Sequence, residues 1–378
     1  MKIAVNTRLM LHNRLEGIGW FAFETLKRIT AAHPEHEFLF LFDRPFHPDF
    51  VFGPNVRPIV LPPKARHPIL FNLWFDFSVA RFLNKHKPDL FLSPDGYLSL
   101  GASVPQLAVI HDLNFEHRPQ DLSRTNARYY LKRFPLFARK AARIATVSRF
   151  SKDDIVARYG ILPDKIDVVL NGASERFVPI SPAEQQSVRD AFADGEPYFL
   201  FVGSLHPRKN LQTLFPAFDY FKEKTGLPHR LLIVGDAYRW DRPIDRAFKS
   251  MKYRSDVRLL GRQSQSDLTR LTAAARASIL VSFFEGFGIP IVEAFRCGTP
   301  VITSDCTSMP EVAGEAAILV NPGNVNAIAN ALKKMATDDV LWQSLSEKAL
   351  ARSRHFSWDN TAKALWESIL KITAQNGG

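Results

Sequence analysis

Short apolar runs alternate with longer segments of helical composition along the whole chain, and this alternation most constrains the fold. The runs lie at residues 3–6, 38–42, 90–93, 107–110, 144–147 and 168–170, and again at 198–202, 231–234, 257–260, 278–281, 301–303 and 318–320. They are continuous, as expected of parallel strands that are covered on both faces. Alternation with helices predicts βαβ units joined by right-handed crossovers, and therefore doubly wound parallel sheets.

The two series of runs predict two similar α/β domains. A chain of 378 residues has room for about two domains. We expect the boundary in the polar, proline-containing stretch 173–197. This gives an N-terminal Rossmann-like domain over 1–175 and a C-terminal one over 176–356. The remaining segment, 357–378, begins at Ser357, a candidate helix N-cap, and is predicted to pack back on the N-terminal domain.

Composition and charge exclude several classes of protein. The content of 46% apolar and 23% charged residues is ordinary for a globular chain. Two cysteines exclude a disulfide scaffold and favour a reducing compartment. No apolar run suits a signal peptide or reaches the roughly 18 residues of a membrane span, so the cytoplasm is the expected location. The formal net charge of +11 favours nucleic acid, acidic lipid or a phosphorylated small molecule as partner.

The loop after the run 278–281 carries the most informative motif. It reads Ser282-Phe283-Phe284-Glu285-Gly286-Phe287-Gly288-Ile289-Pro290 and leads into a helix whose first turn is expected to hold Glu293. Glycines let a ligand approach the backbone closely, and free N–H groups at a helix start bind anions. A carboxylate can accept two hydroxyl groups, which suits a sugar or a ribose diol. We therefore expect Glu285 and Glu293 to face one ligand, the alternative being a capping glutamate with a solvated partner.

The loop after the run 198–202 is a candidate diphosphate site. It reads Gly203-Ser204-Leu205-His206-Pro207-Arg208-Lys209-Asn210. A glycine turn followed by two cations before a helix can cradle phosphates. Lys209 is the expected phosphate contact, and Arg208 either joins it or is a solvated charge at the helix start.

Two loops of the first half add candidates. Gly17 and Gly19 follow the first run and open a helix over 21–30, but a lone Gly-x-Gly fits a plain turn nearly as well. His111 directly follows the run 107–110. It is either a satisfied core residue or part of a site at the carboxyl end of the sheet, where parallel α/β domains bind ligands. With two sheets, we expect the two domains to face a ligand cleft.

Glu285 and Glu293 match the Glu-x₇-Glu signature of retaining glycosyltransferases of the family 4 type, which have the GT-B fold. The chain resembles this family over nearly its whole length. The resemblance implies a nucleotide-sugar donor, with Glu285 near the donor sugar, Glu293 on the donor ribose and His111 near the transferred sugar. Lys209 matches the family lysine. Ser204 stands where the family has an arginine, and Arg208 is the candidate substitute.

The resemblance thus implies catalytic roles for His111, Glu285 and Lys209. The predicted donor-binding residues are Gly17, Gly19, Gly203, Ser204, Arg208, Lys209, Gly261, Glu285, Gly286, Phe287, Gly288, Ile289 and Glu293. The chain has no Asp-x-Asp triplet, which argues against a metal-dependent glycosyltransferase. We expect neither a metal nor a cofactor.

The reaction implied by the resemblance is transfer of a hexose with retained anomeric configuration, the departing phosphate taking the acceptor's proton. Residues 207–210 (Pro-Arg-Lys-Asn) and 111–115 (His-Asp-Leu-Asn-Phe) favour mannose from GDP-mannose. The implied acceptor is a glycan or lipid-linked glycan of a bacterial surface polysaccharide. The alternatives are a nucleotide-sugar epimerase or another enzyme of this architecture, a catalytically inactive sensor, and a nucleic-acid-binding protein, although no nucleic-acid motif is present.

Residues 122–152 contain nine basic side chains and no acidic one, with aromatic residues between them. A basic, aromatic surface helix can lie on anionic lipid and bring the enzyme to a lipid-linked acceptor. The alternative is a solvated basic face whose aromatic side chains pack inward.

Overall fold

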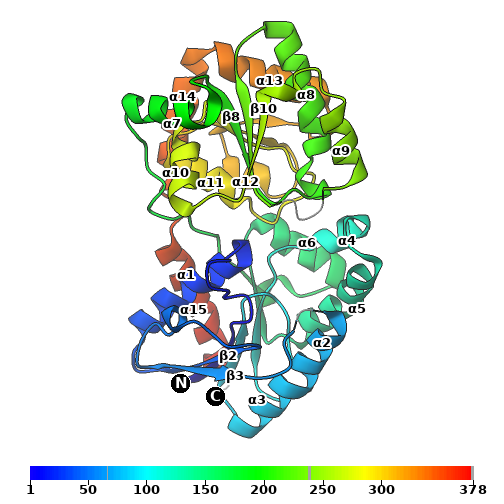
Figure 1. Cartoon of the computed structure of the whole chain (residues 1–378). Helices are drawn as coiled ribbons and strands as arrows, with labels where there is room; N and C mark the ends of the chain where they lie inside the picture. The colour runs from blue at the N-terminus through cyan, green and yellow to red at the C-terminus, as the bar shows by residue number, and fades with distance from the viewer. Residues whose placement is uncertain (66, 237–239, 376–378) are drawn as a thin grey trace. The chain divides into compact units, whose positions relative to one another are not determined.

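The computed structural model describes residues 1–65, 67–236 and 240–375 and divides the chain into two compact units. One unit comprises Met1–Gly172 with Trp358–Gly378, and the other comprises Ala173–Ser357. Figure 1 shows each unit as a parallel sheet flanked by helices. This architecture confirms the predicted α/β fold with two doubly wound sheets.

The first unit is built on a seven-stranded parallel sheet with the order β3-β2-β1-β4-β5-β6-β7. Its strands are β1 (Lys2–Asn6), β2 (Glu37–Phe42), β3 (Val56–Val60), β4 (Leu90–Ser93), β5 (Gln106–Val109), β6 (Arg143–Thr146) and β7 (Ile166–Val168). The central strands are buried along their whole length, because helices cover both faces of the sheet. This explains why they read as continuous apolar runs.

Two strands of this sheet differ from the prediction. β3 lies outside the predicted runs because Arg57 and Pro58 interrupt it. It is an edge strand, where a proline is tolerated since its missing N–H faces no partner. β7 lies two residues before the predicted run 168–170. It includes Asp167, whose carboxylate accepts two hydrogen bonds from Arg143 on the neighbouring strand, at 2.8 and 2.9 Å.

The helices of the first unit are α1 (Gly17–Ala32), α2 (Pro68–Asn72), α3 (Ala80–His86), α4 (Asn114–His117), α5 (Arg124–Lys140), α6 (Arg149–Tyr159) and α15 (Trp358–Gln375). A π-helical segment, η2 (Leu73–Val79), joins α2 to α3.

The last helix, α15, belongs to the first unit although it follows the whole of the second in sequence. Trp358 packs edge-on against Phe21 of α1, with ring centroids 6.4 Å apart. Arg28 of α1 donates to Asp359 at 2.5 Å, and Thr361 donates to the carbonyl of Leu170 at 2.7 Å. Residues 376–378 of the predicted terminal segment lie outside the described part of the chain.

The second unit repeats this design with a six-stranded parallel sheet of order β10-β9-β8-β11-β12-β13. Its strands are β8 (Tyr198–Val202), β9 (Arg230–Val234), β10 (Val257–Gly261), β11 (Ala277–Leu280), β12 (Val301–Ser304) and β13 (Ala317–Val320). Its helices are α7 (Pro182–Ala193), α8 (Leu211–Thr225), α9 (Arg242–Lys249), α10 (Gln265–Ala274), α11 (Ile289–Arg296), α12 (Met309–Ala313), α13 (Val325–Thr337) and α14 (Asp339–Ser353).

Both sheets reverse their strand order at an equivalent place. The chain winds outward in one direction from β1 and resumes on the other side at β4, and it does the same at β8 and β11. In doubly wound sheets the loops on either side of such a reversal diverge, and ligands bind in the crevice outside the carboxyl ends of those strands. The topology therefore points to the loops after β1 and β4 and to those after β8 and β11.

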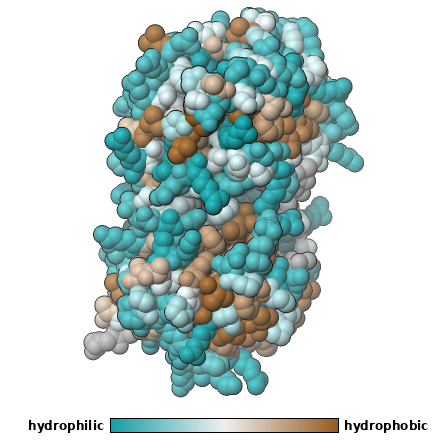
Figure 2. Space-filling model, turned by 60° about the vertical axis from the view of Figure 1, so that its left-hand side comes forward, coloured by the Kyte–Doolittle hydropathy of each residue, from teal (hydrophilic) through white to brown (hydrophobic). Residues whose placement is uncertain are grey.

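The face drawn in Figure 2 is mainly hydrophilic, with hydrophobic side chains gathered in places. Within the described ranges, no helix combines the length and the apolar character that crossing a membrane would require.

Candidate functional site

Lys209 and Glu285 form a buried ion pair between the loops after β8 and β11. These loops lie where the strand order of the second sheet reverses, which we call its switch point. Lys209 ends the short 3₁₀ turn η5 (Pro207–Lys209) after β8, and Glu285 lies in the loop after β11. Nζ of Lys209 lies 2.7 Å from Oε1 of Glu285, and only 8% and 6% of the two residues are exposed. Nη1 of Arg208 lies 2.8 Å from Oε2. Each carboxylate oxygen therefore contacts a different cation.

Hydrogen bonds to backbone carbonyl groups fix the two loops in place. The N–H of Phe283 donates to the carbonyl of Arg208 at 2.9 Å. The buried amide of Asn210 donates to the carbonyls of Val281 and Pro322 at 2.8 and 2.7 Å. These bonds hold the cation-bearing turn against the end of β11, so the charged cluster is set before any ligand arrives.

The charges of the cluster outweigh the effect of burial on Glu285. Burial alone would raise the pKa of this carboxyl, but Arg208 and Lys209 lower it to about 2. Glu285 is therefore ionised throughout the neutral range. Two cations and one carboxylate leave a formal excess of one positive charge, which suits a bound anion.

Glu293 lies on α11 in a very different environment. The structure corrects its predicted position: α11 begins at Ile289, so Glu293 is the fifth helical residue and belongs to the second turn. Its side chain is half-buried, and within the described ranges it has no hydrogen bond or ion pair. Burial raises the pKa of its carboxyl to about 7. A carboxylate in such a place has unused acceptor capacity, as a diol-binding residue requires.

The start of α11 lies at a glycine turn without a side-chain cap. Gly288 is its N-cap residue, with φ of +97°, and no side chain caps the helix. A Cβ atom at Gly288 would lie 3.0 Å from Cδ1 of Ile291 and 3.2 Å from Cδ2 of Leu280. The predicted residues Gly286, Phe287, Gly288 and Ile289 thus form the turn between Glu285 and α11.

The sequence reasoning missed Gly235, which directly follows β9. A Cβ atom at this position would lie 1.9 Å from the carbonyl oxygen of Gly203, so no other residue fits there without moving the backbone. Its N–H donates to the carbonyl of Gly261, the predicted residue at the end of β10, at 2.9 Å. The sequence signal that could have identified Gly235 is its position directly after the run 231–234. That run forms β9, which pairs with β8, the strand before Gly203.

Of the other residues in the candidate diphosphate loop, some take part in the charged cluster and Ser204 does not. At Gly203 the missing side chain leaves space for Lys209, whose Cε would lie 3.4 Å from a Cβ atom there. Ser204 is exposed and lies outside the cluster of charges. Arg208, in contrast, contacts Glu285 and also donates to the carbonyl of Phe284. Of the two positions, Arg208 and not Ser204 therefore contributes to the charged cluster.

The candidates of the first unit lie around the carboxyl end of its own sheet. Gly17 starts α1 and has open space around it, whereas Gly19 is buried, and a Cβ atom there would lie 2.9 Å from the carbonyl of Leu9. Packing alone therefore explains the glycine at 19. His111 donates from Nε2 to the carbonyl of Pro94 at 2.8 Å. Burial lowers the pKa of this imidazole, so it is neutral at pH 7 with a free lone pair on Nδ1.

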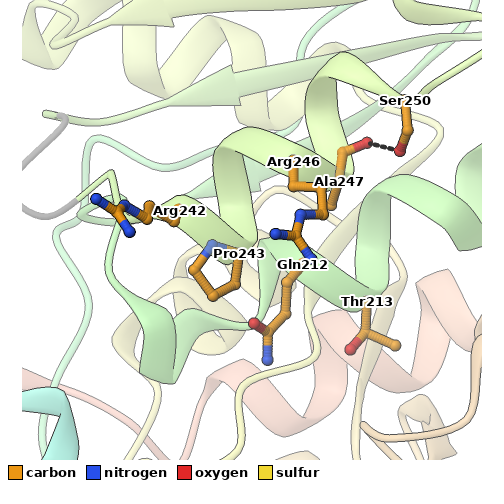
Figure 3. A pocket seen from close by; sticks show the side chains of 7 residues that line it. All are labelled: Gln212, Thr213, Arg242, Pro243, Arg246, Ala247 and Ser250. Carbon is orange, nitrogen blue, oxygen red and sulfur yellow. Dashed lines mark hydrogen bonds between the residues drawn. The ribbon is translucent and has the colours of Figure 1, made fainter.

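A shallow hollow of about 550 Å³ lies elsewhere in the second unit, between the start of α8 and α9. Figure 3 shows Arg242 and Arg246 from α9 beside it, opposite Gln212 and Thr213 of α8. No residue of the charged cluster lines it. The charged cluster at β8 and β11 is the stronger candidate, because there the acid–base chemistry and the topology coincide.

Two family models match the chain, one on each half. Residues 183–352 match "Glycosyl transferases group 1", and residues 15–177 match "Glycosyltransferase Family 4". The chain is 30% identical over 361 residues to O-antigen chain mannosyltransferase B of Escherichia coli, which covers 92% of this chain and 93% of that protein. It is 27% identical over 272 residues to the serotype-specific mannosyltransferase WbdA of E. coli, covering 70% of this chain but 33% of that longer protein.

Solved structures share the fold at lower sequence identity. Sucrose-phosphate synthase from Thermosynechococcus elongatus superposes with a TM-score of 0.78 at 19% identity, covering 99% of both chains. HepE of Anabaena, solved in complex with UDP-glucose, gives a TM-score of 0.76 at 19% identity, covering 98% of this chain and 100% of that one.

Fold, charged cluster and relatives together define a glycosyltransferase of GT-B architecture. The chain belongs to the family of group 1 glycosyl transferases, with a family 4 domain in its N-terminal half. The predicted family and the predicted enzyme class are confirmed. The comparisons support neither an epimerase nor a nucleic-acid-binding protein.

We expect Glu293→Gln to stabilise the enzyme in a pH-dependent way. The pKa of this carboxyl is raised from 4.5 to about 7 in the folded chain. Burial of the ionised carboxylate therefore lowers the free energy of unfolding only where the group is charged. This loss of stability is absent at low pH, develops as pH rises from about 4.5 to about 7, and is complete above that. The shift corresponds to about 3 kcal/mol, which partial exposure reduces to about 2 kcal/mol at pH 8.

Urea unfolding of the wild type and of Glu293→Gln at pH 4 and pH 8 measures this effect. The exposed Glu347 of α14 provides the control Glu347→Gln, for which the change should be small and independent of pH. Equal stabilisation of Glu293→Gln at both pH values would show that the carboxyl is not strained by burial.

Proposed function

We propose that this glycosyltransferase transfers mannose from GDP-mannose, with retention of configuration, to a glycan acceptor. The observation that carries the proposal is the pre-set cluster of Arg208, Lys209 and Glu285 beside the uncapped start of α11. The names of the relatives support the sugar, since three are mannosyltransferases and two of these are named for the O-antigen chain. HepE, with its bound UDP-glucose, supports a nucleotide-sugar donor of some kind.

The chemistry of such a transfer requires charge stabilisation on the departing diphosphate. Positive charges and helix-start N–H groups that are fixed before the reaction stabilise developing charge without reorganisation. Lys209, Arg208 and the start of α11 offer both. Glu285 keeps the two cations in place and, as an ionised acceptor, is suited to hydroxyl groups of the donor sugar.

The donor ribose is assigned to Glu293 in this proposal. Its half-buried carboxyl has unused acceptor capacity, and a vicinal diol offers two donors. Binding a diol would compensate part of the desolvation that raises the pKa of this group. The unfavourable burial of Glu293 then has a functional reason.

The proposal includes donor binding without a metal ion. Its support is the positive excess of the cluster together with the lack of an Asp-x-Asp triplet in the chain. The diphosphate charge is met here by side chains and backbone dipoles.

Calorimetric titration with GDP, UDP, ADP and dTDP, each with EDTA present, tests the donor assignment. We expect GDP to bind most tightly and Lys209→Ala to weaken its binding by roughly ten- to a hundredfold, because a charge-assisted hydrogen bond is lost. The matched control is Lys222→Ala. It removes another buried lysine of the same unit, whose Nζ lies 2.8 Å from Asp256, without touching the cluster.

The control should leave nucleotide affinity unchanged. Tightest binding of a nucleotide other than GDP would reject the base assignment. If no nucleotide bound with EDTA and one bound with added Mg²⁺, the metal-independent site would be wrong.

The anomeric configuration of the product tests retention. With GDP-α-D-mannose as donor and octyl α-D-mannoside as acceptor, we expect an α-linked disaccharide, identified by the one-bond C–H coupling of its anomeric carbon in NMR. A β-linked product would establish inversion and remove the retaining mechanism.

The proposal also includes contact with an anionic membrane through α5 and the neighbouring α2–η2 segment, which Figure 1 draws beside it. Tyr129, Phe134 and Phe137 are buried, so the aromatic side chains of 122–152 pack largely inward, as the alternative prediction held. Most exposed side chains of α5 are basic or apolar, namely Arg124, Arg128, Leu131, Lys132, Leu136, Arg139 and Lys140. Arg133 and Arg143 are excluded from this face, because they pair with Asp76 and Asp167.

The apolar part of this surface comes from α2 and η2. Ile69, Leu73 and Phe77 succeed each other at intervals of four residues and are 63%, 41% and 66% exposed. An exposed apolar stripe beside a basic helix fits the boundary between acidic headgroups and acyl chains.

Co-sedimentation with vesicles measures this contact. We expect binding to vesicles containing phosphatidylglycerol, little binding to pure phosphatidylcholine, and release by salt. The double variant Ile69→Ser/Phe77→Ser should weaken binding by roughly tenfold or more, since two large apolar side chains are lost. The control is Val340→Ser, which changes an 83% exposed residue of the second unit. Equal binding of all three proteins would contradict the assigned surface.

A further inference from the structure

The first unit carries, at its own switch point, a counterpart of the Lys209–Glu285 pair. Arg8 lies in the loop after β1 and Asp95 in the loop after β4, which are the strands equivalent to β8 and β11. Nε of Arg8 lies 2.6 Å from Oδ2 of Asp95. Both residues are 7% exposed. In both units, a buried cation and a buried carboxylate thus pair across the place where the strand order reverses.

The carboxylate of this pair is fully engaged by the protein. Oδ1 of Asp95 accepts from Nδ2 of Asn6 at 2.7 Å, from Oγ of Ser93 at 3.0 Å and from the N–H of Tyr97 at 3.3 Å. Oδ2 accepts from Arg8. Asp95 therefore holds the arginine in place and has little capacity left for a ligand.

The guanidinium of Arg8 is only partly engaged. Within the described ranges its one hydrogen bond is the bond from Nε, which leaves the donors of both terminal NH₂ groups without a protein acceptor. These nitrogens are not among the fully enclosed unpartnered atoms, so they reach solvent. The guanidinium carbon lies 4.5 Å from the ring centroid of Tyr97 and 4.9 Å from that of Phe71. The rings and Asp95 together fix the plane of a forked donor whose two terminal nitrogens are not fully enclosed.

The local charge selects the kind of ligand. Asp95 neutralises Arg8, and the nearby imidazole of His111, which donates to the carbonyl next to Asp95, is neutral at pH 7. Unlike the cluster at β8 and β11, this site has no excess positive charge for an anion. The terminal NH₂ groups of Arg8 are hydrogen-bond donors at a site without net charge. Such donors suit the oxygen atoms of a neutral polyol.

We propose that Arg8 binds hydroxyl groups of the acceptor glycan through its two free NH₂ groups. The proposal rests on the proposed function, since it assumes a glycan acceptor, and it assigns that acceptor to a defined residue of the first unit. Arg8 is thereby a specificity-determining residue, held by Asp95, Asn6 and Ser93 as positioning residues.

Steady-state kinetics of Arg8→Lys test the assignment. Lysine keeps a positive charge beside Asp95 but lacks the planar fork of donors. With GDP-mannose as donor and a panel of octyl glycosides of mannose, glucose, galactose and N-acetylglucosamine as acceptors, we expect KM for the acceptor to rise by roughly ten- to a hundredfold. The affinity for GDP and the slow hydrolysis of the donor by water should stay within twofold of wild type.

A matched control separates this role from stability. Arg143→Lys changes another largely buried arginine of the same unit, paired with Asp167 between β6 and β7, and should leave KM for the acceptor unchanged. Thermal unfolding of both variants shows whether they fold equally well. An unchanged KM in a folded Arg8→Lys enzyme would overturn the proposal.

Direct binding keeps the proposal separate from the donor assignment. Saturation-transfer NMR of the octyl glycosides on the wild type and on Arg8→Lys needs no donor, so it decides the role of Arg8 even if GDP proves to be the wrong nucleotide. Signals that weaken in the variant support the proposal. No binding of any glycoside by the wild type, or Arg8-dependent binding of inorganic phosphate in place of glycosides, would overturn it.

Discussion

The buried carboxylate of Glu285 is the constraint on which the charged cluster of the second unit depends. An ionised carboxylate in a protein interior is tolerated only when cations and hydrogen bonds replace the water it loses. Arg208 and Lys209 supply that compensation from the loop after a neighbouring strand. The same pairing therefore closes the switch point, orders both loops and positions positive charge where an anion can use it. One interaction thus both compensates the buried carboxylate and fixes the two cations of the cluster.

Glu293 shows the opposite relation between stability and function. It is half-buried and has no partner among the residues that the structure describes, and its raised pKa marks a cost to the folded state. Side chains of this kind are characteristic of binding sites, where the ligand supplies the missing partner. Two glutamates eight positions apart thus have opposite electrostatics, one held ionised by neighbouring cations and one kept near its titration point by burial.

The repeated topology connects the two halves of the molecule. Each unit places a cation after its first strand and an acid after its fourth, and each pair bridges the crevice where the strand order reverses. The difference lies in the charge that remains. The second unit retains a positive excess, which suits a diphosphate, whereas the first is neutral and offers directed hydrogen-bond donors. One fold, used twice, can in this way serve two chemically different substrates.

The sequence by itself determined the fold class and singled out the two loops that form the charged cluster. Continuous apolar runs between helices specify parallel sheets, because only strands covered on both faces lack a polar side. The loops with Lys209 and Glu285 could be recognised because glycine, charge and helix start coincide within a few residues.

What only the tertiary structure decided depends on contacts between distant segments. The edge strand β3 is interrupted by Arg57 and Pro58, and only its place in the sheet makes it a strand. Gly235 is required by the backbone of Gly203, and Arg208 joins the charged cluster through its contact with Glu285. The pairing of Arg8 with Asp95 joins residues 87 positions apart, and local pattern carries no information about such a contact.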